Sequence, residues 1–381
     1  MRQAYHGDRV KRLQARLVEA GLGGFLVSQP DSVYYLTGLF HYPSERPILA
    51  WVPDAGNITL AVPLLEADHA DGVVDDVIVY DEFPGSPDAW DTVMDAYRAR
   101  GLGRGAVGYE GSLAAAYVER LRRIGLVLTQ ASDHIQALRM SKGPEEIALL
   151  RKAGEYSVRM VAEGIRWILE RGPTVREVEV VEHVTEHVIG LIAEAGDDLV
   201  FVQSVGGGLV CFGDHSSLPH ALPSLRQLGD ASVVLLSLGC MVGGYAAECE
   251  RTFFLNRPTD DQRYVHEAVQ EAQEVGFRAL RVGTPCEQAD QVARAVLVER
   301  GFGPYIRHRL GHGMGLRFHE PPWVAPGDRT PMPPYAVVSC EPGLYLPGRF
   351  GVRIADTVLV TEEGPERLTD DPSGCEVPTI R

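Results

Sequence analysis

The 381-residue sequence lacks three features: a basic run, a long apolar stretch and a hydrophobic amino-terminal segment. Lys and Arg number 36 against 52 Asp and Glu, a net charge of −16 that would repel phosphate backbones, so nucleic acid is not expected as a partner. No apolar stretch reaches the ~18 residues that a membrane span requires. The polar amino end contains no signal-peptide core. These absences predict a cytoplasmic protein without a membrane partner.

Cysteine is also scarce, which argues against a disulfide framework. The six cysteines stand at positions 211, 240, 249, 286, 340 and 375. None of them forms a C-x-x-C pair, and most lie inside apolar runs such as Val233–Cys240. This is the pattern of buried, reduced thiols, and it favours a reducing compartment.

The composition, with 45% hydrophobic and 23% charged residues, is that of a globular chain long enough for two domains. Helical signals lie at 8–21, 87–99 and 113–123, and strand signals at 22–28, 47–53, 58–63, 77–82 and 105–110. Strands that alternate with helices predict an α/β domain. We therefore expect a mixed α/β (α+β) protein, with one domain at 1–137 and a second at 138–381.

The second domain is predicted to begin with a long amphipathic helix that runs to about residue 170. Ser141 is the expected N-cap and Pro144 lies near the first turn, followed by two acids that a helix N-terminus favours. Further helices are predicted at 174–194, 259–280 and 287–300, and the remaining segments read as strands.

Polar side chains that look out of place cluster in the second domain. They lie in the segments 216–220, 243–254, 309–322 and 337–345. A Glu or His within strand-like apolar sequence must be paired, hydrogen-bonded or functional, because its burial otherwise costs several kcal/mol. If these residues converge in space, they form a site.

These segments resemble the creatinase and Xaa-Pro peptidase superfamily. The matching strings are SKGPEEIALLRKA at 141–153, SLPH at 217–220, GHGMGLRFHEPP at 311–322, EPGLY at 341–345 and GVRIADTVLV at 351–360. The resemblance implies a pita-bread catalytic domain behind a creatinase-like amino-terminal domain, and assembly as a homodimer. The family's metallopeptidases hold two divalent ions with five side chains, whose positions fall on Ser237, Glu248, His312, Glu341 and Ala355.

A serine and an alanine thus stand where the resemblance implies two carboxylates. Bridging carboxylates are what make two closely spaced cations tolerable, so a pair of ions is not expected. Two alternatives remain: a metal-free site, which we favour, or one divalent ion held by Glu248, His312 and Glu341.

The sequence resembles creatinase itself in two details: His220, and Glu250 before Arg251. We therefore predict a hydrolase without a cofactor that cleaves a C–N bond in a small amine-, amide- or guanidine-like substrate, with His220 as general acid and base. The expected catalytic residues are His220, Glu248, Glu250, His312 and Glu341, and the expected substrate-binding residues are His319 and Arg46. The alternatives are a mono-metal Xaa-Pro dipeptidase or aminopeptidase, a non-hydrolytic biosynthetic enzyme, and an inactive binding protein on the same fold.

Several of these residues also have structural interpretations. Glu250 could pair with Arg251 or with another base on a β-strand, and His308 reads as a surface residue. Residues 183–187 match the zinc pattern H-x-x-E-H on a predicted helix, which we interpret as a chance match because the resemblance places the catalytic residues elsewhere.

Overall fold

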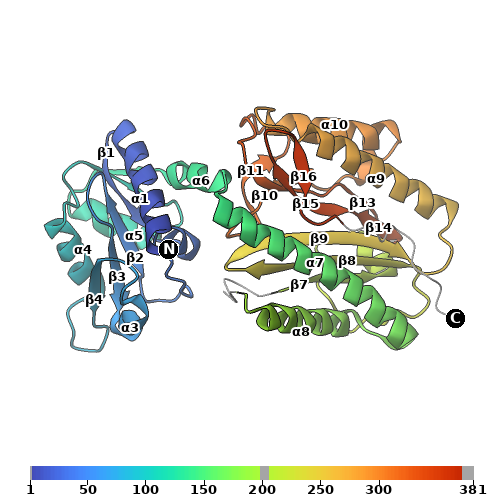
Figure 1. The fold of residues 1–381 in the computed structure, drawn as a ribbon, viewed down its shortest axis with the longest axis horizontal. Coiled ribbons are helices and arrows are strands. Elements are labelled where there is room, and N and C mark those ends of the chain that lie inside the picture. Colours follow the sequence, from blue (N-terminus) through green and yellow to red (C-terminus); the bar gives the residue numbers. More distant parts are fainter. Residues whose placement is uncertain (1, 198–205, 371–381) are drawn as a thin grey trace. The chain divides into compact units, whose positions relative to one another are not determined.

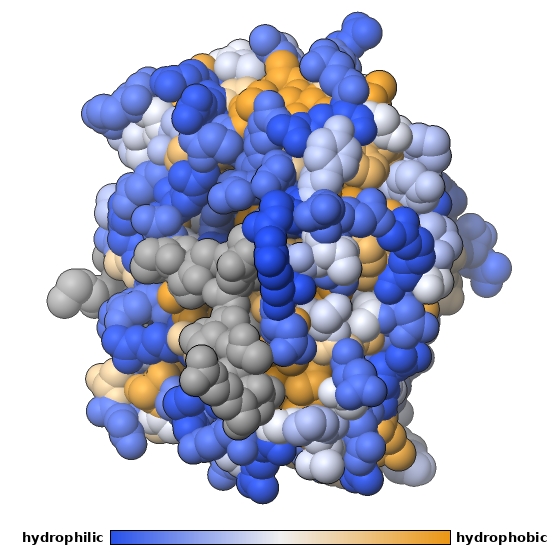
Figure 2. Space-filling view, turned by 90° about the vertical axis from the view of Figure 1, so that its right-hand side faces the viewer, coloured by the Kyte–Doolittle hydropathy of each residue, from blue (hydrophilic) through white to orange (hydrophobic). Residues whose placement is uncertain are grey.

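The computed structural model describes residues 2–197 and 206–370, which fall into two compact units (Figure 1). The first unit ends at Arg139 and the second begins at Met140. Among the described helices, none is long and apolar enough to cross a bilayer. Figure 2 shows a face on which hydrophilic residues predominate and hydrophobic residues form separate patches.

The first unit is built around a six-stranded mixed sheet with the strand order β4-β3-β2-β1-β5-β6. Its strands are β1 (Leu22–Val27), β2 (Leu49–Pro53), β3 (Thr59–Pro63), β4 (Asp76–Tyr80), β5 (Ala106–Tyr109) and β6 (Leu128–Gln130). Its helices are α1 (Arg2–Glu19), α2 (Pro30–Thr37), α3 (Ala67–Ala70), α4 (Ala89–Ala99), α5 (Ala115–Arg123) and α6 (Ser132–Met140). Trp51, Trp90 and Tyr97 lie in a core between the sheet and helices α4 and α5. The predicted α/β fold is confirmed for this unit.

The second unit contains an eight-stranded sheet in the order β11-β10-β12-β15-β9-β8-β7, with β16 beside β15. The strands are β7 (Gly206–Phe212), β8 (Val233–Val242), β9 (Tyr245–Phe254), β10 (Gly311–Gly313), β11 (Glu320–Val324), β12 (Val337–Cys340), β15 (Ala355–Val360) and β16 (Pro365–Arg367). A separate hairpin consists of β13 (Gly343–Leu346) and β14 (Phe350–Arg353).

Two helix pairs cover different halves of this sheet (Figure 1). The helices are α7 (Pro144–Arg171), α8 (Glu177–Ala195), α9 (Asp260–Ala279) and α10 (Cys286–Glu299). Helices α7 and α8 share one hydrophobic core with β7, β8 and β9, whereas α9 and α10 share a second core with the later strands. The four helices predicted in this half of the chain are therefore present, with ends that differ by a few residues.

The start of α7 differs from the prediction. Gly143, and not Ser141, occupies the N-cap position, and the Glu146 carboxylate accepts a hydrogen bond from the Gly143 amide (2.8 Å). Ser141 instead donates its hydroxyl to the Pro334 carbonyl (2.6 Å). Pro144 at the first helical position forbids an earlier start, because a proline disfavours helical geometry in the residue before it.

A buried histidine on α9 makes the stability of the second unit sensitive to acid. The His266 ring packs edge-on against Phe254, with ring centroids 5.6 Å apart, and burial lowers the pKa of His266 to about 4. An imidazole in the unfolded chain titrates near 6.5. Between these values the unfolded chain binds a proton that the folded chain does not, so the free energy of unfolding decreases as pH falls from 6.5 towards 4.

We expect this histidine to account for about 2 to 3 kcal/mol of the stability lost between neutral pH and about pH 4.5. Urea denaturation at both pH values should show a correspondingly smaller loss in His266→Phe. Equal losses in the two proteins would contradict the assignment.

Candidate active site

Three side chains from separate strands of the second unit converge on one point. Glu248 lies on β9, His312 on β10, and Glu341 directly follows β12. One potential ligand atom from each lies within 4.8 Å of the other two. His312 Nε2 is 3.0 Å from Glu341 Oε1 and 3.7 Å from Glu248 Oε1. The sheet thus brings together the three residues that the sequence analysis named as the possible site of one divalent ion.

The strand geometry explains which side chains reach this point. Side chains alternate between the two faces of a strand, so Glu248 and Glu250 share one face of β9 and Arg251 points to the other. On β10, a side chain at Gly311 would place its Cβ 2.0 Å from the Ser339 carbonyl oxygen. Only glycine permits this close approach of β10 to β12, which sets His312 beside Glu341.

The charges of the three groups depend on one another. Burial raises the pKa of Glu248, although the nearby His312 opposes this effect. Burial would also raise the pKa of Glu341, but contact with His312 outweighs it and holds that pKa below its usual value. Burial by itself favours a neutral His312, yet the two carboxylates raise its pKa. The group as a whole therefore attracts positive charge.

Two polar atoms in this group lack hydrogen-bond partners among the described residues. They are Glu248 Oε1 and His312 Nε2, although His312 Nε2 makes an ion-pair contact with Glu341 Oε1 at 3.0 Å. A buried polar atom without a partner, such as Glu248 Oε1, costs on the order of 1–3 kcal/mol, and its persistence calls for an explanation. Two carboxylates and an imidazole suit a divalent ion such as manganese, iron, cobalt or zinc, so the residues present fit one ion.

Glu250 lies next to this group, between two short side chains. It is directly opposite Ser237 on β8 and Ala355 on β15. The Ser237 hydroxyl donates to one carboxylate oxygen of Glu250, and Nε of Arg353 donates to the other at 2.5 Å. Both Glu250 and Arg353 are buried. Each oxygen of this carboxylate therefore already has a donor from the protein.

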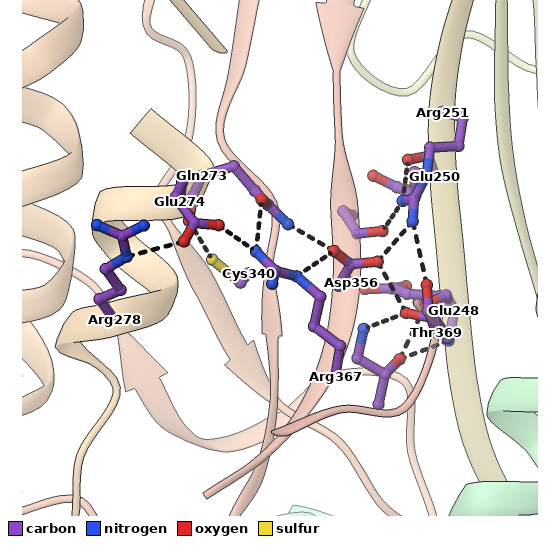
Figure 3. A network of polar contacts seen from close by, with 12 residues as sticks. Glu248, Glu250, Arg251, Gln273, Glu274, Arg278, Cys340, Asp356, Arg367 and Thr369 are labelled. Carbon is purple, nitrogen blue, oxygen red and sulfur yellow. Dashed lines mark hydrogen bonds and ion pairs between the residues drawn. The ribbon is translucent and has the colours of Figure 1, made fainter. Parts of the chain in front are cut away.

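Of the two structural pairings suggested for Glu250, the one with Arg251 is wrong, and the one with another base on a strand is confirmed, because Arg353 on β14 pairs with it. Arg251 is directed towards Asp356 on β15, where its Nη2 donates to Oδ1 at 2.7 Å (Figure 3). Asp356 also accepts hydrogen bonds from Gln273 and Thr369. This network lies on the face of the sheet opposite to Glu250, as the alternation of side chains requires.

The histidines of the prediction occupy different places around the group. His319 stands edge-on to His312, with ring centroids 4.0 Å apart, and the packing around its ring lowers the pKa of His319 to about 4. His220 is exposed, in the turn after Leu218, and is near enough to His319 to contribute to this lowering. His308 is not a surface residue, because it is half-buried and its Nε2 lies 2.8 Å from the Tyr345 hydroxyl.

Two further sequence features have local partners elsewhere. Arg46 belongs to the first unit, where it pairs with Glu45 and with Glu82. Its role in substrate binding stays a prediction. In the H-x-x-E-H string, His183 contacts Glu163 (2.5 Å) and stacks on Trp167, with centroids 3.8 Å apart. These contacts anchor α8 to α7, and they support the interpretation of the string as a chance match.

Arg353 is the principal residue that the sequence reasoning missed. It was part of a quoted string, GVRIADTVLV, but was not singled out. The available signal was an arginine at the end of an apolar strand, where a buried cation needs an anionic partner. Its contact with Glu250 links positions 103 residues apart, and such long-range pairing leaves no periodic trace in one sequence.

Comparison with known proteins identifies the family. The model of metallopeptidase family M24 matches residues 148–362, and the creatinase/prolidase N-terminal domain matches residues 9–141. The chain therefore belongs to metallopeptidase family M24, and the pita-bread fold implied by the sequence is confirmed. It is a hydrolase that acts on C–N bonds, as predicted.

Individual relatives match along nearly their whole length. The chain is 30% identical over 364 residues to an Xaa-Pro dipeptidase of Pyrococcus furiosus, which covers 95% of this chain and 97% of the relative. It is 31% identical over 371 residues to a probable dipeptidase, PepE, of Mycobacterium tuberculosis, with 96% and 95% covered. A crystal structure of prolidase from Thermococcus sibiricus superposes with a TM-score of 0.87 at 27% identity, covering 98% of this chain and 99% of that one.

These comparisons overturn the predicted reaction. A metal-independent, creatinase-like hydrolase is wrong, because the relatives are named as dipeptidases and the family is one of metallopeptidases. The expectation of no cofactor is likewise unsupported. The alternative of an Xaa-Pro peptidase with one divalent ion agrees better with these findings and with the three converging side chains that could hold an ion.

Proposed function

We propose that this chain is a metal-dependent peptidase that hydrolyses Xaa-Pro dipeptides with a single divalent ion. The observation that carries the proposal is the convergence of Glu248, His312 and Glu341, with two buried ligand atoms that have no hydrogen bond among the described residues. The relatives named as Xaa-Pro dipeptidases support the choice of substrate.

The charge of the group supports one ion and not two. Glu248 and Glu341 together supply two negative charges, which balance one dication. Ser237 and Ala355, the positions where the family resemblance implies two more carboxylates, offer no anionic ligand, and both oxygens of Glu250 accept hydrogen bonds from the protein. A second dication would therefore be held without a compensating charge.

When bound, the ion would polarise the scissile carbonyl and lower the pKa of a water molecule. The residues of the chain have separate tasks. His312 would have to be neutral to hold an ion through the lone pair of Nε2, so it would give up the proton that the two carboxylates otherwise favour on its ring. We assign the exposed His220 and His319 to the substrate, because an imidazole can donate a hydrogen bond to a carbonyl or carboxylate oxygen.

A panel of dipeptides tests this proposal. The purified protein should cleave Xaa-Pro dipeptides, lose this activity on dialysis against a chelator, and regain it on addition of Mn²⁺, Co²⁺ or Zn²⁺. Matched dipeptides that carry alanine in place of proline serve as the control for specificity. Cleavage that survives removal of the metal, or no cleavage of any Xaa-Pro dipeptide by the metal-loaded protein, would refute the proposal.

We also propose that the protein works in the reducing cytoplasm as a homodimer. The five cysteines in the described part of the chain are buried and form no disulfide with one another, and burial raises the pKa of Cys211, Cys240, Cys286 and Cys340. Thiols of this kind are inert and need no oxidising compartment. The dimer follows from the family resemblance, and light scattering on the purified protein tests it.

A further inference from the structure

The side chain of Arg353 connects the sheet beside the candidate ion site to the turn that carries His220. Its guanidinium is buried at the end of β14 and distributes its donors among three partners. Nε donates to Glu250 at 2.5 Å, and Nη1 donates to the Tyr345 hydroxyl at 3.0 Å. Nη1 also donates to the carbonyl of Pro219 at 2.9 Å, one residue before His220.

Glu250 holds this arginine in place. Ser237 and Ala355 flank Glu250 on the neighbouring strands, and their short side chains leave room for the glutamate between them. The Ser237 hydroxyl donates to one oxygen of Glu250, and this leaves the other oxygen directed at Arg353. A planar guanidinium fixed at Nε has little freedom in the direction of its remaining N–H groups, so the position of Nη1 is set as well.

The segment around His220 is anchored on both sides of the turn. Glu177 accepts hydrogen bonds from His215 (2.8 Å) and from the Ser224 hydroxyl (2.7 Å). The hydrogen bond from Arg353 to Pro219 lies between these two anchors, at the tip where His220 is exposed. Backbone hydrogen bonds from Leu218 to His215 and from Ala221 to Leu218 also shape this turn, but the bond from Arg353 is the one that ties the Pro219 carbonyl to the residues beside the candidate ion site. A side chain displaced by about 1 Å can cost 100-fold in rate.

We propose that Arg353 is a positioning residue: held by Glu250, it fixes the Pro219 carbonyl and thereby places His220 near His319, whose ring packs against His312. The kinetic part of this inference rests on the proposed peptidase function. The structural part does not, because the order of the turn can be measured without any substrate.

The test uses the double variant E250M/R353M, because removing only one partner would leave a buried charge uncompensated, whereas apolar replacement of both is often tolerated. Hydrogen-exchange mass spectrometry of the full chain should show faster exchange in peptides covering 218–225. The matched control is K142M/E320M, which removes another buried ion pair of the same unit and should leave exchange in these peptides unchanged. Unchanged exchange in E250M/R353M would overturn the inference.

A double-mutant cycle with His220 separates positioning from general stabilisation. On an Xaa-Pro dipeptide, E250M/R353M should lower kcat/KM by about 10- to 100-fold while the content of bound Mn²⁺ stays that of the wild type. His220→Ala should then cost less than about threefold in the E250M/R353M background, although it costs much more in the wild type. Equal costs of His220→Ala in both backgrounds, or loss of the bound Mn²⁺, would contradict a positioning role.

A second variant covers the case in which E250M/R353M does not fold. Arg353→Lys keeps a positive charge for Glu250, but its single ammonium group cannot reproduce the fork that reaches both Glu250 and Pro219. It should show the same faster exchange at 218–225. If Arg353→Lys exchanged like the wild type, the Pro219 hydrogen bond would not order the turn and the proposal would fail.

Discussion

Glu341→Gln is expected to remove the bound ion and, with it, at least about 100-fold of the peptidase activity. Glutamine keeps the shape of the side chain but withdraws one of the two negative charges that would balance a dication. Loss of a partner outside the coordination sphere already costs 10- to 100-fold in affinity or activity, so loss of a direct ligand should cost more. The measurement is metal content by mass spectrometry together with kcat/KM on an Xaa-Pro dipeptide.

The matched control for this prediction is Glu177→Gln, which removes a buried carboxylate of the same unit outside the ligand group. It should retain an ion that Glu341→Gln loses. If Glu341→Gln bound metal as tightly as the wild type, Glu341 would not be a ligand. The thermal unfolding temperature of Glu341→Gln should be compared with that of the metal-free wild type, so that loss of the ion is separated from loss of the fold.

Glu177→Gln has the second large expected effect, which falls on stability. The carboxylate is fully buried at the start of α8, and it accepts hydrogen bonds from the Phe212 amide (2.8 Å), from His215 and from Ser224. The backbone amides of Phe212 and Ser224 donate to different oxygens of Glu177, so the NH₂ group of glutamine would face one of these N–H donors in either orientation and leave it unsatisfied. We expect the free energy of unfolding to decrease by about 3 kcal/mol or more.

Urea denaturation of the wild type and Glu177→Gln, both without metal, measures this decrease directly. The comparison must be made on the metal-free proteins, since an ion that binds only the folded chain adds to its stability. An exposed glutamate of the same helix, Glu182, provides the control, and Glu182→Gln should change the stability by less than about 0.5 kcal/mol. A loss below about 1 kcal/mol in Glu177→Gln would contradict its role as an anchor.

The sequence predicted the helices of the second unit better than their exact ends. Helices α7 and α9 are long and amphipathic, so the helical spacing of their apolar residues repeats over enough turns to identify each helix even where single residues favour another structure. The N-cap of α7 was misplaced because Ser141 is a good capping residue in isolation, whereas its hydroxyl is used by the distant Pro334 carbonyl. In the first unit, the short helix α6 at Ser132–Met140 was not predicted, since nine residues give a weak periodic signal.

In the site, too, residues that stand out from their neighbours in the sequence could be predicted, whereas contacts between distant positions could not. Glu248, His312 and Glu341 could be singled out because charged residues in apolar strands need a reason, and the structure brings them together. The inference from missing ligands to a metal-free site was wrong because it counted the losses at Ser237 and Ala355 and gave too little weight to the three residues that remain. Those three are enough for one ion. Arg353 was missed because its partners, Glu250 and Pro219, are more than 100 residues away in the sequence.

The central claim is that one divalent ion sits between Glu248, His312 and Glu341 and drives peptide hydrolysis. It is tested most directly by titrating the metal-free protein with Mn²⁺ and following bound metal by mass spectrometry and by electron paramagnetic resonance. The account predicts saturation at one ion per chain, with the spectrum of an isolated Mn²⁺, and activity that rises in parallel with occupancy. Saturation at two ions per chain with a spectrum of coupled ions, or full activity without bound metal, would contradict it.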